Sequence, residues 1–306
     1  MLIHLDTDFG GDTDDACALA MLLGWPEVEI VGITTTADRD GLRAAYVEYF
    51  LKLAGRSAIP VVAGAGSSMT TRAAADPVRD DERHWPATIS PRPATPGAAL
   101  DLLAGSLARG ATIVAIGPWT NLALLEIVRP GSLRRTSTVV MGGWVAPPDA
   151  GLPAWGPEMD FNVQWDTHAA EIVFTTAGDL AMVPLAPTLK AHLRAADLPR
   201  LCTSGPLGAL LACQGEAHGE TYGMAGLGRA HTGLPDDLLN FQYDPVTCAV
   251  ALGWEGATVE EMRLRPVSDG TVLRFQPDEA GRPVRVVTDI DGAAFAAGWL
   301  QAVEAV

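Results

Sequence analysis

Short apolar runs alternate with stretches of helical periodicity over the first part of the chain. The short runs predict strands near residues 2–5, 28–33, 59–63, 112–116, 136–141 and 180–183, and the helical spacing predicts helices over 16–23, 42–54, 97–108, 120–128 and 167–176. This alternation is typical of a mostly parallel sheet with helices on both faces. The predicted fold class is therefore α/β, with an open, Rossmann-like sheet.

Three loop-rich stretches interrupt this rhythm. Residues 64–96 are rich in Gly, Ser, Pro and charge, residues 142–166 in Gly, Pro and Trp, and residues 219–240 include the Gly-rich segment 219–233. Further helices are expected at 205–219, 245–252 and 291–303, and strands at 258–264, 271–275 and 284–288. Because long loops often form binding surfaces, we expect one domain over 1–306 with active-site loops near these stretches. Plain surface structure explains 64–96 equally well.

The composition narrows the possible partners. The 306 residues are 48% hydrophobic and 19% charged, which is enough apolar material for a core that encloses a pocket. A net charge of −16 opposes binding to nucleic-acid backbones or anionic membranes, so a small neutral molecule or a cation is the expected partner. Four scattered cysteines, no apolar leader and no run long enough for a membrane span predict a cytoplasmic protein with free thiols.

The most informative segment is Asp6-Thr-Asp8-Phe-Gly-Gly-Asp12-Thr-Asp14-Asp15, which places five carboxylates between the first strand and the first helix. Open α/β sheets bind their ligands at such carboxyl ends of strands. Five like charges repel one another unless a cation holds them, and oxygen ligands without nearby Cys or His favour Ca²⁺ or Mg²⁺ over zinc. Helix capping by Asp12 and Asp14 is the simpler alternative, but it accounts for only one or two of the five.

Polar segments occur at other predicted element ends as well. Strands are followed by Ile33-Thr-Thr with Asp38, by Gly117-Pro-Trp-Thr120-Asn121 and by Met141-Gly-Gly, and helices are preceded by Asp160-Phe-Asn162 and Tyr243-Asp244-Pro245. The strand-end segments should meet at the sheet edge that carries the acidic run. Taken singly, Asp160, Asp166 and Asp244 are each better explained as helix caps.

Together and in this order, the segments resemble the nucleoside hydrolases of the inosine–uridine-preferring type. The start Asp6-Thr-Asp8 … Gly … Asp14-Asp15-Ala16 is similar to that family's signature, with two extra residues between the Gly and the Asp pair. Each other segment is weak alone, but the ordered set extends over most of the chain. The resemblance implies an enzyme that hydrolyses the N-glycosidic bond of a ribonucleoside, or a related N-riboside, to free base and ribose.

The resemblance also implies roles for individual residues. A Ca²⁺ ion would be held by Asp8, Asp15, the backbone carbonyl of Thr120 and Asp244, and the sugar would be bound by Asp14, Asn162 and Asp160, the last in place of the family's usual Glu. Asp6 would lie behind the ligands and orient them. A homodimer or homotetramer is implied in the same way.

The chemistry of N-glycoside cleavage agrees with these residue types. The transition state carries positive charge at C1′, which a pocket lined by carboxylates stabilises. A divalent cation lowers the pKa of a bound water, and a carboxylate that touches both ion and water can take the proton. We expect Asp8 to be the base that activates this Ca²⁺-bound water.

Three positions depart from the family pattern. Tyr243 stands where many relatives have a His that protonates the leaving base; because a phenol can donate a hydrogen bond or stack on a base, Tyr243 is a candidate for this role. Ala154 replaces an Asn that contacts the sugar, and Trp155 beside it is expected to cover the site. Arg39 replaces an Asn or Asp, whose contact a neighbouring acid such as Asp38 would supply.

Three histidines lie in or beside the predicted loops. His84 lies near where relatives carry a base-contacting His and is a candidate contact to the leaving group. His218 and His231 flank the Gly-rich segment 219–233, which looks like a mobile flap, and both are expected at the surface. The sequence does not distinguish a purine from a pyrimidine as the leaving base.

Two other functions fit parts of the sequence. A haloacid-dehalogenase-like phosphatase also starts with Asp-x-Asp after a strand and would use Asp6 as nucleophile and Asp8 as acid–base with Mg²⁺, but Lys52 and Lys190 lack the context of its phosphate-binding lysine. The non-enzymatic alternative is a catalytically altered relative that binds a nucleoside and Ca²⁺, which the three departures leave open.

Overall fold

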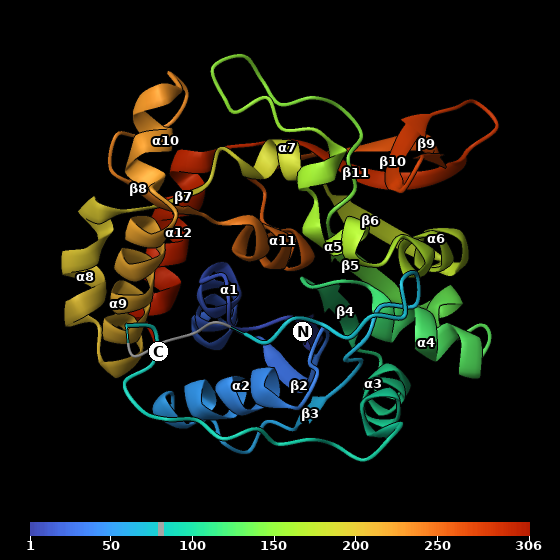
Figure 1. The fold of residues 1–306 in the computed structure, drawn as a ribbon, viewed down its shortest axis with the longest axis horizontal. Helices are drawn as coiled ribbons and strands as arrows, with labels where there is room; N and C mark the ends of the chain where they lie inside the picture. The colour runs from blue at the N-terminus through green and yellow to red at the C-terminus, as the bar shows by residue number, and fades with distance from the viewer. Residues whose placement is uncertain (79–82) are drawn as a thin grey trace.

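The computed structural model describes residues 1–78 and 83–306, drawn as a ribbon in Figure 1. Its strands are β1 (Leu2–Thr7), β2 (Glu29–Thr35), β3 (Val61–Ala63), β4 (Thr112–Ala115), β5 (Ser137–Met141), β6 (Asp179–Val183), β7 (His192–Arg194), β8 (Leu238–Phe241), β9 (Ala257–Asp269), β10 (Val272–Pro277) and β11 (Arg282–Ile290). Its helices are α1 (Asp14–Gly24), α2 (Leu42–Leu53), α3 (Ala98–Ala108), α4 (Thr120–Val128), α5 (Phe161–Trp165), α6 (Thr167–Thr176), α7 (Leu185–Thr188), α8 (Leu198–Thr203), α9 (Pro206–Thr221), α10 (Met224–Ala230), α11 (Tyr243–Ala251) and α12 (Gly292–Glu304).

Within the described residues, nine strands form one sheet in the order β10-β9-β11-β6-β5-β4-β1-β2-β3. The seven strands from β11 to β3 pair in parallel, and β9 pairs antiparallel with both β11 and β10. The chain builds outward in one direction from β1 to β3 and in the other from β4 to β6. This reversal leaves a crevice at the carboxyl ends of β1 and β4, the place where such sheets bind ligands.

Both faces of the sheet are buried at its centre, where successive residues of one chain segment belong to different hydrophobic clusters. Ile113 and Ala115 of β4 share a cluster with side chains of α4 and α6, whereas Val114 and Ile116 share one with side chains of α1, α11 and α12. Figure 1 shows α8, α9 and α10 gathered on one side of the molecule and β9 and β10 on the other. Parallel strands covered on both faces read as almost continuous apolar runs.

The predicted α/β fold with a mostly parallel sheet is confirmed. Most predicted elements end within two residues of the observed ones. Six short elements were not predicted, namely α5, α7, α8, α10, β7 and β8. Each has three to seven residues, which are too few to show a helical or strand period clearly. The segment expected to be a flap contains α10, whose Met224 packs in a cluster with Leu238 and Phe241.

The long loops differ in how they are held. In the 142–166 loop, Asp149 forms an ion pair of 2.6 Å with Lys190, and the carbonyl of Gly151 accepts from the backbone nitrogen of Gly233 at 2.9 Å. The hydrogen bond joins this loop to the 219–240 region, and the ion pair joins it to the segment before β7. The part of the 64–96 loop at residues 79–82 lies outside the described residues. Over the described ranges, every helix is too short or too polar to cross a bilayer.

Candidate active site

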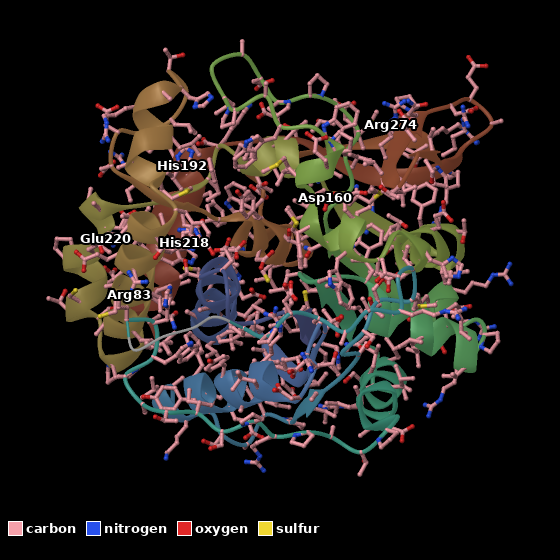
Figure 2. The ribbon with its side chains drawn as sticks, in the orientation of Figure 1. Arg83, Asp160, His192, His218, Glu220 and Arg274 are labelled. Atoms are coloured by element: carbon pink, nitrogen blue, oxygen red, sulfur yellow. The ribbon has the colours of Figure 1, made fainter. Side chains whose placement is uncertain are left out.

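A cavity of about 600 Å³ lies at the crevice beyond β1 and β4. Acidic side chains of the β1–α1 loop, of the first turn of α1 and of α11 line its floor. One wall comes from the segment around α5, and the opposite wall comes from α9 and the residues that follow it. Figure 2 labels one residue from each wall, Asp160 at the start of α5 and His218 on α9, with α1 and α11 between them. The topology therefore brings chain segments far apart in sequence around one cavity.

Two glycines and one arginine shape the loop between β1 and α1. Gly10 and Gly11 have φ angles of +86° and +118°, which glycine adopts without strain. Arg43 of α2 donates through Nη1 to the backbone carbonyls of Asp8 and Gly10 and through Nε to that of Ala37 at 3.0 Å. The guanidinium therefore fixes the backbone of the residue predicted to be the base.

A third glycine allows the loop after β4 to approach Asp8. A Cβ atom at Gly117 would lie 2.7 Å from the backbone nitrogen and Oδ1 of Asp8 and from Cγ2 of Thr36. Any side chain there would displace one of these groups, so the Gly-Pro-Trp-Thr-Asn segment needs its glycine for this close approach. Asn121 in the same segment donates to Oδ1 of Asp6 at 2.7 Å.

Three buried carboxylates form the centre of the floor. Oxygens of Asp14, Asp15 and Asp244 lie within 4.8 Å of one another, and Asp8 lines the same cavity. Burial raises the pKa of Asp14, Asp15 and Asp244 well above the usual range, and the charges of neighbouring carboxylates raise it further. Burial also raises the pKa of Asp8, against the opposing effect of the Arg43 guanidinium. The ionised cluster is therefore costly unless positive charge joins it.

The donors present suit a hard divalent cation. The clustered atoms are all carboxylate oxygens, the ligands that Ca²⁺ and Mg²⁺ prefer. Asp14, predicted to contact the sugar, belongs to the same oxygen cluster as the predicted ligands Asp15 and Asp244. Thr120 is buried at the start of α4, where its hydroxyl donates to Asp166 at 2.8 Å. Thr120 is not among the described residues that line the cavity. The role of its carbonyl as an ion ligand therefore stays a prediction.

Asp6 lies behind the floor and is held by two neighbouring segments. Its Oδ1 accepts from the hydroxyl of Thr34 and from Asn121, while its Oδ2 is buried without a partner in the described part of the chain. Burial raises the pKa of Asp6 to about 7, and these two hydrogen bonds oppose the rise. One residue further on, the hydroxyl of Thr7 donates to Asp15. The hydroxyl of Thr7 at the end of β1 thus holds the carboxylate of Asp15 on the side away from the cavity.

Asn162 and Asp160 line the wall around α5. Nδ2 of Asn162 donates to the carbonyl of Ile116 at 2.9 Å, which ties this wall to the end of β4. Asp160 accepts from the backbone nitrogens of Val163 at 3.2 Å and of Gly143 at 2.5 Å. Asp160 is therefore the cap of α5 and a wall residue at once.

The carboxyl of Asp160 should make stability depend on pH. Burial raises its pKa from 3.8 to about 6, so the folded state binds a proton that the unfolded state has already released. The resulting stabilisation is complete below pH 3.8 and is lost as the pH rises through about 6. Between about pH 4 and about pH 7, the free energy of unfolding of the wild type should fall by roughly 2 to 3 kcal/mol relative to that of Asp160→Asn. Urea unfolding across this range measures the difference, and parallel curves would contradict the prediction.

Aromatic side chains make up much of the remaining wall. The ring of Trp155 packs edge-on against Phe241 at 5.4 Å, and Phe241 lies 5.5 Å from the ring of Tyr243. Phe161 and Tyr222 also line the cavity, although they are 52% and 64% exposed. Exposed aromatic rings beside a polar floor suit a ligand with one flat, apolar part.

Tyr243 is poorly suited to give up a proton. Burial raises the pKa of its phenol well above 10, and the negative charges of Asp12, Asp14 and Asp244 raise it further. The phenol therefore stays protonated at neutral pH and can act as a hydrogen-bond donor.

Two predicted site residues lie away from the cavity wall. The carboxylate of Asp38 accepts from the hydroxyl of Thr35 at 2.7 Å and from the backbone nitrogen of Gly41 at 3.0 Å, so its own loop uses its oxygens. His84 lines a neighbouring cavity of about 520 Å³ that shares Phe161 and Tyr222 with the main cavity, and its carbonyl accepts from Gln214 at 3.0 Å. Neither Asp38 nor His84 is among the described residues that line the main cavity. Their contacts to substrate stay predictions.

Arg43 and His218 line the cavity, although neither was predicted from the sequence to belong to the site. The role of Arg43 could not be predicted from the sequence, because its contacts are to backbone carbonyls of other loops. The expectation that His218 lies at the surface is wrong: it is only 6% exposed and lines the cavity. His218 lies four residues before Tyr222, which caps α9, so both rings lie on the same face of the helix. This spacing is the feature of the sequence from which the position of His218 could have been predicted.

Known proteins share both the sequence pattern and the fold. A family model described as inosine-uridine preferring nucleoside hydrolase matches residues 3–297. The pyrimidine-specific ribonucleoside hydrolase RihA of Salmonella enteritidis PT4 is 36% identical over 220 residues, which are 69% of this chain and 68% of that protein.

Two solved structures are similar in fold. The plant nucleoside hydrolase PpNRh1 superposes with a TM-score of 0.79 at 24% identity, over 100% of this chain and 99% of that one. A purine-preferring ribonucleoside hydrolase from Gardnerella vaginalis superposes with a TM-score of 0.81 at 22% identity, over 99% and 98%. With the family match over nearly the whole length, these findings show that the chain belongs to the inosine-uridine preferring nucleoside hydrolases, enzymes that cleave the N-glycosidic bond of ribonucleosides.

Proposed function

We propose that this chain hydrolyses a ribonucleoside to free base and ribose with a Ca²⁺ ion held by Asp8, Asp15 and Asp244, and by the predicted carbonyl of Thr120. The observation that carries the proposal is the cluster of buried carboxylate oxygens within 4.8 Å of one another, next to an aromatic wall. Carboxylate oxygens are the ligands that Ca²⁺ prefers.

The residues of the floor divide the work between water and sugar. When bound, the ion would supply positive charge that acidifies a water molecule and binds vicinal hydroxyls of the sugar. Asp8 takes the proton of the attacking water, and Arg43 keeps the backbone of Asp8 in place for this transfer. Asp14, Asn162 and Asp160 bind the sugar hydroxyls.

The acidic floor also favours the transition state. As the bond between C1′ and the base nitrogen lengthens, positive charge develops on the sugar ring, and the surrounding carboxylates stabilise it. Trp155 and Tyr243 lie where a flat base can stack, and the phenol of Tyr243 can donate a hydrogen bond to it. Binding energy from the base thus helps to position C1′ over the floor.

The phosphatase alternative requires a lysine that binds the phosphate group, and neither lysine of the chain is placed for this role. Lys52 lies at the end of α2, and Lys190 is engaged by Asp149 and Asp289 at 2.6 Å each. Neither lysine is among the described residues that line the cavity, so a phosphate group would meet carboxylates there. The family match favours the hydrolase as well.

We also propose the domain organisation, the compartment and the oligomeric state from the resemblance to the family. Residues 1–306 would form a single domain, and the protein would be a cytoplasmic homodimer or homotetramer. A pyrimidine riboside is the first substrate to test, because the RihA relative is named pyrimidine-specific. Purine ribosides come second, after the purine-preferring relative of similar fold.

A substrate panel tests the proposed function. Purified protein with added Ca²⁺ should release ribose from uridine, cytidine, inosine or adenosine, and it should release no phosphate from a set of phosphomonoesters. Binding of a nucleoside by calorimetry without any ribose release would support the non-enzymatic alternative. Phosphate release without ribose release would support the phosphatase.

A further inference from the structure

Asp12 and His218 form a pair that the roles assigned above do not use. Asp12 belongs to the two extra residues of the acidic run, and its Oδ1 accepts from the backbone nitrogen of Thr13 at 2.6 Å and from the side chain of Asn240. Nδ1 of His218 lies 3.9 Å from the same oxygen. Both side chains line the main cavity, so the pair joins the β1–α1 loop to α9 at the wall opposite Asp160.

The imidazole of His218 is buried but not used by the fold. Its side chain is 7% exposed, and Nδ1 is buried without a hydrogen-bond partner among the described residues. The ring lies 4.6 Å from that of Tyr222, which is 64% exposed and lines the same cavity. A buried polar atom without a partner costs free energy, and such atoms call for an explanation in a ligand or a reaction.

Cleavage of a nucleoside needs a proton donor at the base. Without one, the base must leave as an anion, which is a poor leaving group. Imidazole is the side chain best suited to donate a proton near neutral pH.

We propose that His218, oriented by Asp12, donates a proton to the leaving base. The inference rests on the proposed hydrolysis and adds to it the donor and its positioning residue. The carboxylate of Asp12 faces Nδ1 of the ring, while Asn240 and the backbone of Thr13 hold Asp12 in place. The other ring nitrogen, Nε2, is then available to the base.

The proton balance closes without a further reactant. The bond between C1′ and the base nitrogen breaks, the base keeps the electron pair, and it accepts the proton of His218. Water adds its hydroxyl to C1′ and gives its proton to Asp8. Transfer of that proton through solvent from Asp8 to His218 restores both side chains, so one water is consumed for each ribose and base formed.

Two substrates with different leaving groups test the donor. Uridine has a leaving base that needs a proton, whereas 4-nitrophenyl β-D-ribofuranoside releases a phenolate that leaves unprotonated. The variant His218→Gln keeps a side chain of similar length but cannot transfer a proton. We expect kcat/KM for uridine, or for the best nucleoside of the panel, to fall at least about 100-fold, and that for the nitrophenyl riboside to change less than about threefold.

Further variants separate chemistry from folding. Asp12→Asn keeps an oxygen for Thr13 but loses the charge, so it should lower kcat for the nucleoside about tenfold and spare the nitrophenyl riboside. The exposed His168→Ala is the matched control and should match the wild type on both substrates. If His218→Gln fails to fold, as judged by circular dichroism, the selectivity of Asp12→Asn decides.

The other outcomes overturn the inference. Equal losses on both substrates would mean that the pair only supports the structure, and unchanged rates would mean that it has no part in catalysis. A selective loss in Tyr243→Phe, and none in His218→Gln, would return the role to Tyr243. If the wild type cleaves neither riboside, the proposed hydrolysis itself is wrong and the inference falls with it.

Discussion

Replacing Asp8 by asparagine is expected to lower kcat for nucleoside hydrolysis by about a thousandfold. Asparagine keeps an oxygen that can touch an ion but cannot take a proton from water. The backbone of residue 8 should stay in place, because Arg43 binds its carbonyl rather than its side chain. Initial rates of ribose release at saturating Ca²⁺ and saturating nucleoside measure the effect.

Saturating Ca²⁺ is important in this experiment because Asp8 is also a proposed ligand. Measured so, the loss should fall on kcat rather than on the Ca²⁺ requirement. Asp269→Asn, an exposed carboxylate at the end of β9, is the matched control and should behave as the wild type. A kcat of Asp8→Asn within about tenfold of the wild type would show that another group is the base.

The second large effect is expected for the carboxylates at the centre of the floor. Asp15→Asn and Asp244→Asn should each weaken Ca²⁺ binding at least about a hundredfold, since each removes a charged ligand. Isothermal titration with Ca²⁺ on protein first treated with chelator measures the affinity. Activity at limiting Ca²⁺ should fall in parallel.

Without a bound cation, the same two variants should be more stable than the wild type. Burial and mutual repulsion raise the pKa of Asp15 and Asp244, so removing one charge relieves a cost of the metal-free fold. The melting temperature of each metal-free variant should therefore exceed that of the metal-free wild type, whereas a given Ca²⁺ concentration should stabilise the wild type more than either variant. A variant that binds Ca²⁺ as tightly as the wild type would remove that residue from the proposed site.

The strands and the floor were predictable from the sequence for physical reasons. Strands buried on both faces, such as β4, read as continuous apolar runs, and glycines mark the points where Gly10 must turn and Gly117 must approach Asp8. The acidic residues follow β1 directly, so the topology of an open sheet predicts where they lie. The crevice at the ends of β1 and β4 is where the structure has them.

The wall that receives the base was not predictable in the same way. The pairing of Asp12 with His218 depends on how α9 packs against a loop more than two hundred positions earlier in the sequence. The Gly-rich segment after α9 gave no period, yet it contains α10 and packs on β8. Asp38 shows the converse: an acid at a strand end can be used entirely by its own loop.

The most direct test of the account is the joint release of ribose and base by metal-free and Ca²⁺-restored protein. Purified wild type, freed of metal with chelator, should leave uridine and inosine intact. Added Ca²⁺ should restore cleavage of at least one of them, with ribose and free base formed in equal amounts and no requirement for phosphate. Cleavage that continues at the full rate in chelator, or restored metal with no ribose from any ribonucleoside, would contradict the central claim that the acidic floor holds a cation for N-glycosidic hydrolysis.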